Sequence, residues 1–443
     1  MDISSLTGGG SQPSKEQPPA FEYQASVASP VINGDAKLTV GGDALTVSSL
    51  FDTVEIPYAD IDAFELSDYT VRIGTAFGTF AISRLGSFCE GFHKELREAY
   101  FKKVLKALFI SGSPLIETAG EYRFTEYGET KQGKASFQIY ENCVAILTAD
   151  GNSRRVPLCF AVGMDKADFQ LTISLDTGER YSFIRLGYDT DSFEKCVTDR
   201  IRAIRADALK TVQELDGALN TMQAASIAKL LPEGAAAPLG QLAAIAPSLV
   251  TALDIKISES RAADSYAVFK EICDLAQICV GFKKAFEEVG GEAAPGGLPD
   301  IGAMMGAVPG LAKETPDMAE GEAMEDKPKD NSILWMIAPG GNGHSAAVEF
   351  AVDDGESAAT FVYRFDETWS VFSKSLNRAM EAIDFKREVI RLTGDELKQS
   401  KHNDYRMAVK LTAALRFVRS KFAARVIHSS VESWKRGIIN HFE

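Results

Sequence analysis

Two stretches of the chain repeat one another at a spacing of about 100 residues, and this repeat constrains the fold more than any other feature. Arg84-Leu85-Gly86 recurs as Arg185-Leu186-Gly187, and at the same offset of 101 Phe92 corresponds to Phe193. Upstream, Asp68–Ile73 corresponds to Asp168–Ile173 at an offset of 100. The one-residue difference falls in the intervening hairpin, where an insertion costs least. A repeat of this length predicts two copies of one compact unit.

Within each copy the hydrophobic period changes from two residues to about four. From Lys37 to Ser83 apolar and polar residues mostly alternate over short runs, which predicts six or seven antiparallel strands. From Phe88 to Leu108 apolar residues recur every four positions, which predicts an amphipathic helix. The second copy follows the same plan, with Phe137/Ile139, Val144/Ile146 and Tyr181/Phe183 ahead of Phe193, Val197, Ile201 and Ile204. A small bent sheet leaves one end of its core open, and an apolar helical stripe can cover that end.

This order of elements resembles the pleckstrin-homology-like superfold, in which seven strands in two near-orthogonal sheets are capped by a C-terminal helix. The resemblance covers residues 36–108 and 120–207. It implies an α+β protein with tandem PH-like antiparallel β-sandwiches, each capped by a C-terminal helix, at 35–112 and at 118–222, the second with an extended helix. Lipid-binding members carry a basic cluster between the first strands. Here those loops read Gly41-Gly42-Asp43 and Glu141-Asn142, so headgroup recognition is not implied.

The rest of the chain divides by composition. Residues 1–34 begin with a polar stretch rich in Gly, Ser and Pro and are expected to form a disordered lead, and 223–275 to form an Ala-rich helical linker. Residues 276–392 contain strand-like runs and a helix, and are either a degraded third PH-like copy or an unrelated meander. Within them, 290–331 lacks apolar periodicity, which predicts a disordered acidic insert. That insert is either a tolerated loop or a docking motif.

The overall charge and the cysteines limit the partners and the compartment. The 443 residues carry a net charge of −15, which disfavours nucleic acid and, less strongly, an anionic membrane as partners. Six cysteines are scattered without a C-x-x-C pair, as expected for reduced thiols in a cytoplasmic protein. The N-terminus lacks the basic and apolar regions of a secretory signal.

No motif in the sequence points to a chemical mechanism. The five histidines include no pair at metal-ligand spacing, and the glycine clusters lack the context of a P-loop or a dinucleotide fold. We therefore expect no catalytic residue, no metal and no cofactor, and a chain that is not an enzyme. Arg84 and Arg185 are either ligand contacts or residues needed for folding, and we favour the folding role.

The C-terminal segment 400–443 is the best candidate for a binding surface. It is predicted to be a basic amphipathic helix, and residues 384–443 contain 13 lysines and arginines against 7 aspartates and glutamates. The candidate partner-binding residues are Arg406, Lys410, Leu415, Arg419, Phe422, Arg425 and Trp434. Such a helix can pack on the acidic body of its own chain or of a second copy, bind another protein, lie on a membrane or grip a nucleic-acid backbone, and we favour the first of these.

From these features we expect a non-catalytic adaptor or scaffold that binds other proteins or a second copy of itself. The alternative is a peripheral membrane protein that acts through the basic C-terminal helix.

Overall fold

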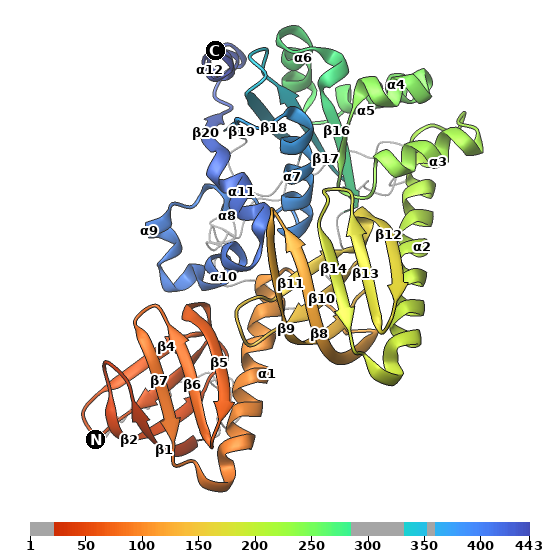
Figure 1. Ribbon diagram of the computed structural model, residues 1–443. Helices are drawn as coiled ribbons and strands as arrows, with labels where there is room; N and C mark the ends of the chain where they lie inside the picture. Colours follow the sequence, from red (N-terminus) through yellow and green to blue (C-terminus); the bar gives the residue numbers. More distant parts are fainter. Residues whose placement is uncertain (1–21, 285–331, 352–358) are drawn as a thin grey trace, which may run out of the picture.

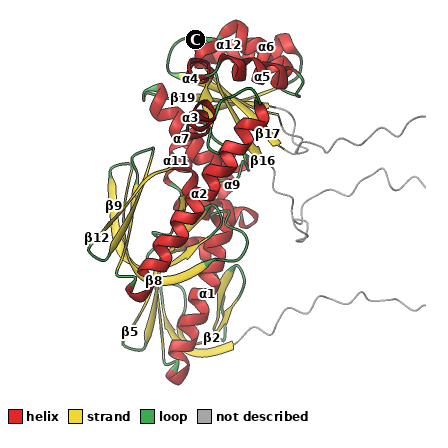
Figure 2. Cartoon of the chain, turned by 90° about the vertical axis from the view of Figure 1, so that its right-hand side faces the viewer, coloured by secondary structure: helices red, strands yellow, loops and turns green. Residues whose placement is uncertain are grey.

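A computed structural model describes residues 22–284, 332–351 and 359–443 of the chain. The described residues form an α+β protein with three antiparallel sheets, each belonging to a separate unit. We call residues 22–110 the first unit, 116–215 the second unit and 221–442 the third unit. Figure 2 shows the units as a column, with the first unit at one end and the third at the other.

The first and second units share one topology, seven antiparallel strands followed by one long helix (Figure 1). The first unit consists of β1 (Glu22–Ala28), β2 (Asn33–Val40), β3 (Ala44–Ser48), β4 (Thr53–Pro57), β5 (Ile61–Ser67), β6 (Thr70–Thr75), β7 (Gly78–Ser83) and α1 (Cys89–Ala107). The second consists of β8 (Ile116–Glu126), β9 (Glu129–Ile139), β10 (Cys143–Leu147), β11 (Arg154–Pro157), β12 (Ala161–Ala167), β13 (Gln170–Leu175), β14 (Arg180–Ile184) and α2 (Thr190–Leu215). The strand orders are β4-β3-β2-β1-β7-β6-β5 and β11-β10-β9-β8-β14-β13-β12. This is the tandem PH-like arrangement that the repeat predicts.

The two helices close the cores of their sheets, as expected. Phe92 of α1 is 0% exposed and Phe193 of α2 is 1% exposed. The Phe193 ring lies 5.0 Å from the ring of Phe183 and 6.3 Å from that of Phe137, centroid to centroid. Each helix therefore inserts its apolar stripe into its own sheet, because covering the open end removes aromatic surface from water.

The expected disordered lead at 1–34 is wrong for its last part. β1 begins at Glu22 and pairs with both β2 and β7, so it holds the two halves of the first sheet together. Its inward side chains include only Ala25 and Val27 as buried residues. Such small side chains give a weak alternating pattern, which explains why the strand was missed. Residues 1–21 lie outside the described residues.

The third unit is a six-stranded sheet covered by helices on both faces. Its elements are α3 (Thr221–Leu230), β15 (Ala236–Pro238), α4 (Leu239–Ile245), α5 (Pro247–Ser258), α6 (Ala263–Ile272), β16 (Cys279–Lys284), β17 (Ser332–Pro339), β18 (Ser345–Ala351), β19 (Ala359–Arg364), α7 (Trp369–Ala382), α8 (Glu388–Arg391), α9 (Gly394–Leu397), α10 (Asn403–Leu411), α11 (Ala413–Lys421), β20 (Phe422–Ile427) and α12 (Val431–Phe442). β18 is buried along almost its whole length, as a strand covered on both faces must be.

The third unit is not a third PH-like copy. Its strand order is β15-β16-β17-β18-β19-β20, a plain meander that lacks the pairing of first and last strands found in the other two units. Segment 223–275 is mostly helical, as predicted, but it is not a linker, because Leu242, Leu253 and Phe269 are buried in the core of this unit. The helix of the second unit ends at Leu215, before the expected position 222. The expected insert 290–331 lies outside the described residues.

The expected basic helix at 400–443 is divided into α10, α11, β20 and α12. Phe422–Ile427 is an edge strand that pairs with β19, although its residues continue the helical spacing of the preceding segment. Backbone pairing to a neighbouring strand therefore outweighed local periodicity. Among the described residues, no helix is both long and apolar enough to cross a lipid bilayer.

We predict that Phe193→Ala destabilises the protein by about 3–5 kcal/mol, because it leaves a cavity where α2 closes its sheet. The measurement is urea unfolding followed by circular dichroism. The matched control is Phe77→Ala, at a side chain that is 78% exposed. It should change the unfolding free energy by less than about 0.5 kcal/mol. Equal losses for the two variants would contradict the role given to Phe193.

Candidate functional site

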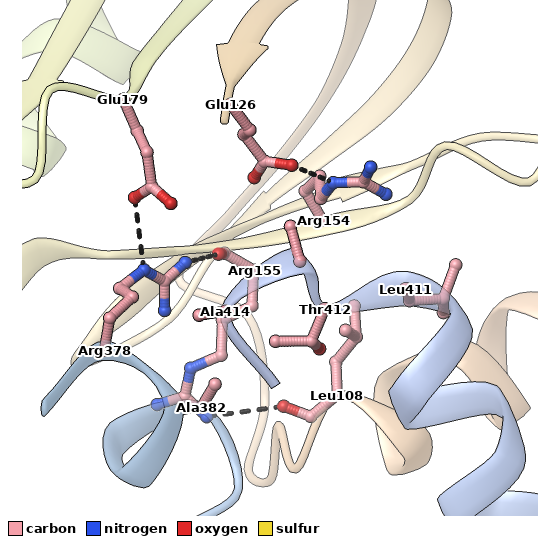
Figure 3. A pocket seen from close by; sticks show the side chains of 11 residues that line it. Leu108, Glu126, Arg154, Arg155, Glu179, Arg378, Ala382, Leu411, Thr412 and Ala414 are labelled. Carbon is pink, nitrogen blue, oxygen red and sulfur yellow. Dashed lines mark hydrogen bonds and ion pairs between the residues drawn. The ribbon is translucent and has the colours of Figure 1, made fainter. Parts of the chain in front are cut away.

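The most concentrated group of buried charges lies between the second and third units (Figure 3). Its members are Glu126, Arg154, Arg155 and Glu179 from the second unit and Arg378 and Glu381 from α7, and none is more than 8% exposed. We call these six residues the buried ionic cluster. Removing so many charges from water is unfavourable unless each is paired, so their contacts decide what the cluster can do.

Arg378 is the residue that joins the two units. Its Nε lies 3.3 Å from Glu179 Oε2, its Nη1 3.3 Å from Glu381 Oε2, and its Nη2 donates to the backbone oxygen of Arg155 at 2.9 Å. Arg155 in turn donates from Nη2 to Glu381 Oε1 at 2.5 Å. Figure 3 shows Arg378 reaching from α7 to the second unit. Burial raises the pKa of Glu179, and the Arg378 charge opposes this effect.

The other half of the cluster lies within the second unit. Arg154 Nε donates to Glu126 Oε2 at 2.7 Å, and the Tyr181 hydroxyl also donates to Glu126. The Arg154 guanidinium stacks over the Phe124 ring at 4.5 Å from its centroid. Every member is thus held by a partner of opposite charge. The cavity that the cluster lines measures about 10 Å³, close to the minimum for one water molecule. The arrangement joins the second and third units through paired charges.

We predict that Arg378→Met destabilises the protein by about 3–5 kcal/mol, because Glu179 is then buried without a partner charge. The double variant Arg378→Met with Glu179→Gln should be less destabilised than the single one, since it leaves no unpaired carboxylate there. Urea unfolding measures both. Arg202→Met, which removes an exposed pair with Asp199 on α2, should have little effect. A double variant at least as unstable as the single one would argue against this pairing.

A second polar cluster joins β18, β19 and the segment before α12. The Thr360 hydroxyl donates to Glu349 Oε2 at 2.5 Å and accepts from Trp434 Nε1 at 2.7 Å, while His428 Nε2 lies 3.0 Å from both Glu349 Oε2 and Thr360 Oγ1. A catalytic triad needs the two ring nitrogens to face different partners. Here one nitrogen faces both, and Thr360 is fully buried. The cluster anchors α12.

His428 makes this anchor sensitive to pH. Its hydrogen bond to Glu349 raises the pKa of the ring above the usual 6.5, against the opposing effect of burial. The pair therefore contributes its full stability below about pH 6.5 and loses it as the pH rises through the raised pKa.

We predict that amide exchange in α12 becomes faster, relative to the His428→Gln variant, as the pH rises through this range. Glutamine cannot titrate, so the variant serves as the reference at each pH. Hydrogen exchange with mass spectrometry measures the difference, and a pH-independent difference would contradict the assignment.

The C-terminal residues expected to bind a partner instead contact their own chain. In α10, Arg406 pairs with Asp60 at 2.8 Å, and Lys410 donates to Asp62 at 2.7 Å and to the Ile61 oxygen at 2.8 Å. Asp404 pairs with Lys103 and Lys106 of α1. Burial raises the pKa of Asp404, but the hydrogen bonds from the two lysines outweigh it and hold the pKa below its usual value. α10 thus ties the first unit to the third.

The other five expected residues lie within the third unit. Leu415 and Trp434 are buried in two different cores, and Phe422 packs 5.6 Å from Phe361, ring centroid to ring centroid. Arg419 donates to the backbone oxygens of Val389, Ile390 and Leu392, and Arg425 is half-buried opposite Phe361 in the β19–β20 pair. The seven residues do not form one open surface. Their placement agrees with the intramolecular alternative that the charge pattern left open.

Arg84 and Arg185 serve the turn from the last strand into the capping helix. Both have left-handed backbones, with φ of 59° and 57°, and so do the nearby Gly86 and Gly187, with φ of 58° and 62°. The side chains point to solvent, where Arg185 pairs with Glu121 at 2.5 Å. This geometry supports the folding role that we favoured for the repeated motif.

Sequence reasoning missed an exposed apolar surface on the first unit. Val31, Leu50, Phe51 and Phe77 are 55%, 85%, 89% and 78% exposed. They lie on the β1–β2, β3–β4 and β6–β7 loops, which project from the same end of the strands; we call this surface the apolar loop end. A Cβ on Gly78 would lie 2.7 Å from Pro30 Cγ, so two of these loops touch. The only sequence signal was a Leu-Phe pair inside a turn.

The part of the chain that the structure describes contains all six cysteines. Within it no three His, Cys, Asp or Glu side chains gather as metal ligands would. All six cysteines are free thiols, and burial raises the pKa of Cys143 to about 11, which disfavours the reactive thiolate.

The fold defines a chain with two PH-like units in tandem, joined through buried charges to a third unit of different topology. No protein-family model matches the chain, and a search of the curated proteins also finds no match. Among solved structures, that of the Spt16D–Pob3N heterodimer shows a likeness that covers 37% of this chain and 87% of that chain, with 11% sequence identity and a TM-score of 0.17. A likeness at this level does not bear on function.

Proposed function

We propose that the chain is a non-catalytic, protein-binding scaffold of the cytoplasm, whose PH-like units present binding surfaces to other proteins. The observation that carries the proposal is the apolar loop end. Single exposed apolar residues are common on protein surfaces, but a group of large ones at one end of a unit is typical of an interaction site. Aromatic side chains are also enriched at the centres of protein interfaces.

The polar clusters support a non-catalytic role. Catalysis requires acid, base or nucleophilic groups that a substrate can reach. The buried ionic cluster and the Thr360–Glu349–His428 cluster satisfy their charges internally, and their contacts fix the relative position of structural elements. We therefore assign both clusters to stability, and the surface of the first unit to function.

The peripheral-membrane alternative loses the feature that motivated it. It required a continuous basic helix at 400–443, and that segment is divided into four elements. Arg406 and Lys410 pair with Asp60 and Asp62 of the first unit, so these charges are already neutralised within the chain. No observation on the described residues favours nucleic acid as a partner.

We predict that a photo-cross-linking amino acid at position 51 captures a defined protein from native cytosol, and that the same group at position 69 does not. Tyr69 is 78% exposed on the same unit but at the opposite end of the strands. Mass spectrometry identifies the products, and the captured protein is then purified and titrated against the full chain. The same products from both positions, or none from position 51, would count against the proposal. A C-terminal deletion is unsuitable, because it removes buried residues such as Leu415 and Trp434.

A further inference from the structure

In the second unit, the β8–β9, β10–β11 and β13–β14 loops correspond to the loops that form the apolar loop end of the first unit. Their contacts indicate what this end of a PH-like unit can bind. The β13–β14 turn of the second unit faces α7. There Lys374 Nζ donates to the backbone oxygen of Asp176 at 3.3 Å, and Arg378 pairs with Glu179. Its β8–β9 turn carries Tyr127, which stacks on Phe417 of α11 at a centroid distance of 5.8 Å. In the second unit this end is therefore a docking surface for helices of the third unit.

The remaining loop of the second unit, between β10 and β11, packs on the first unit. The backbone nitrogen of Phe64 donates to the backbone oxygen of Ala149 at 2.9 Å, and a Cβ on Gly151 would lie 2.5 Å from the backbone oxygen of Asp62. Each of the three loops of the second unit thus contacts a neighbouring part of the chain, although Tyr127 stays 46% exposed.

The corresponding loops of the first unit differ in chemistry and in cover. Where the second unit has Glu126 and Glu179 on its hairpins, the first has Val31 and Phe77 on the matching ones, and its β3–β4 loop adds Leu50 and Phe51. These four side chains are exposed to solvent in the described structure. The same end of the fold therefore contacts helices of the third unit in one copy, and in the other it carries four exposed apolar side chains.

The charges around this end are acidic. In segments 29–35, 49–52 and 75–78 the only charged residues are Asp35 and Asp52. Both are exposed. A surface of this kind favours a ligand with an apolar centre and cations at its edge. It disfavours the anionic surface of cytoplasmic membranes, which attracts basic segments.

We propose that the apolar loop end of the first unit binds an amphipathic α-helix of a partner protein, a helix with an apolar face flanked by lysine or arginine. The inference rests on the proposed function and specifies its partner. A helix is the expected ligand because the second unit binds α7 with the equivalent loops. Phe51 and Phe77 enter the apolar face of the partner helix, and Asp35 and Asp52 pair with its cations. An aromatic anchor with a polar rim is the usual anatomy of a helix-binding site.

The experiment selects ligands for the full chain from a displayed library of random peptides with the length of α7, 14 residues. Selected peptides are then titrated against the chain, against the triple variant Leu50→Ser, Phe51→Ser, Phe77→Ser, and against the control Tyr69→Ser, Phe88→Ser. The control removes two exposed aromatic side chains, 78% and 66% exposed, from the opposite end of the unit. Circular dichroism and thermal unfolding verify that both variants keep their fold.

We expect selected peptides with apolar residues at i, i+3, i+4 and i+7 and a net positive charge, which bind the triple variant at least about 30-fold more weakly and the control unchanged. Peptides that bind the triple variant equally well, or that are acidic or lack helical spacing, would overturn the inference. So would binding of the chain to neutral phosphatidylcholine vesicles that the triple variant loses, since the loops would then be a membrane anchor. Cross-linking from position 51 without any such peptide would leave the scaffold proposal standing and refute only the helical ligand.

Discussion

The relative position of the second and third units depends on how buried arginines are paired between them. Arg378 of α7 contacts Glu179 and the backbone oxygen of Arg155, both in the second unit. The Arg155 side chain in turn pairs with Glu381, which also lies on α7. Each of these charges would be costly if it were buried alone, so the second and third units have one favourable relative arrangement. The α10 helix ties the first unit to the third through partly exposed pairs, in which Arg406 and Lys410 neutralise Asp60 and Asp62. The three units are thus fixed by interactions that specify position as well as contributing stability.

The same end of the PH-like unit has different roles in the two copies. In the second unit it holds the rest of the molecule through ion pairs and a tyrosine, and in the first unit it presents apolar side chains to solvent. Duplication of a unit followed by divergence of its loops yields this outcome, because the strands and the capping helix tolerate changes at the loop tips. The conserved part of the repeat, around Arg84 and Arg185, lies at the opposite end and serves the turn into the helix. The loops that differ between the copies are those on which the proposed function depends.

The sequence predicted most strands and helices of the first two units and several of the third, but it did not predict the topology of the third unit. In the PH-like units the strands alternate and the helices carry a stripe such as Phe92, Leu96 and Tyr100, so local spacing reflects which face is buried. In the third unit the strand-like runs and the helix expected within 276–392 are confirmed as β16 to β19 and α7. The strand order, and the helices that cover both faces of the sheet, depend on contacts between residues far apart in sequence. The strand β1 was missed because its buried positions hold only Ala25 and Val27. The segment Phe422–Ile427 carries helical spacing, yet it forms an edge strand.

By itself the sequence determined that two copies of a bent sheet, each closed by an apolar helix, occur in this chain, since period and repeat are local properties. It also determined that the C-terminal segment is basic and the remainder acidic. Only the tertiary structure decided that those basic residues are used within the chain, and that Val31, Leu50, Phe51 and Phe77 remain uncovered. The pairing of charges far apart in sequence, and the exposure of a loop, depend on which surfaces meet, and no local pattern encodes that.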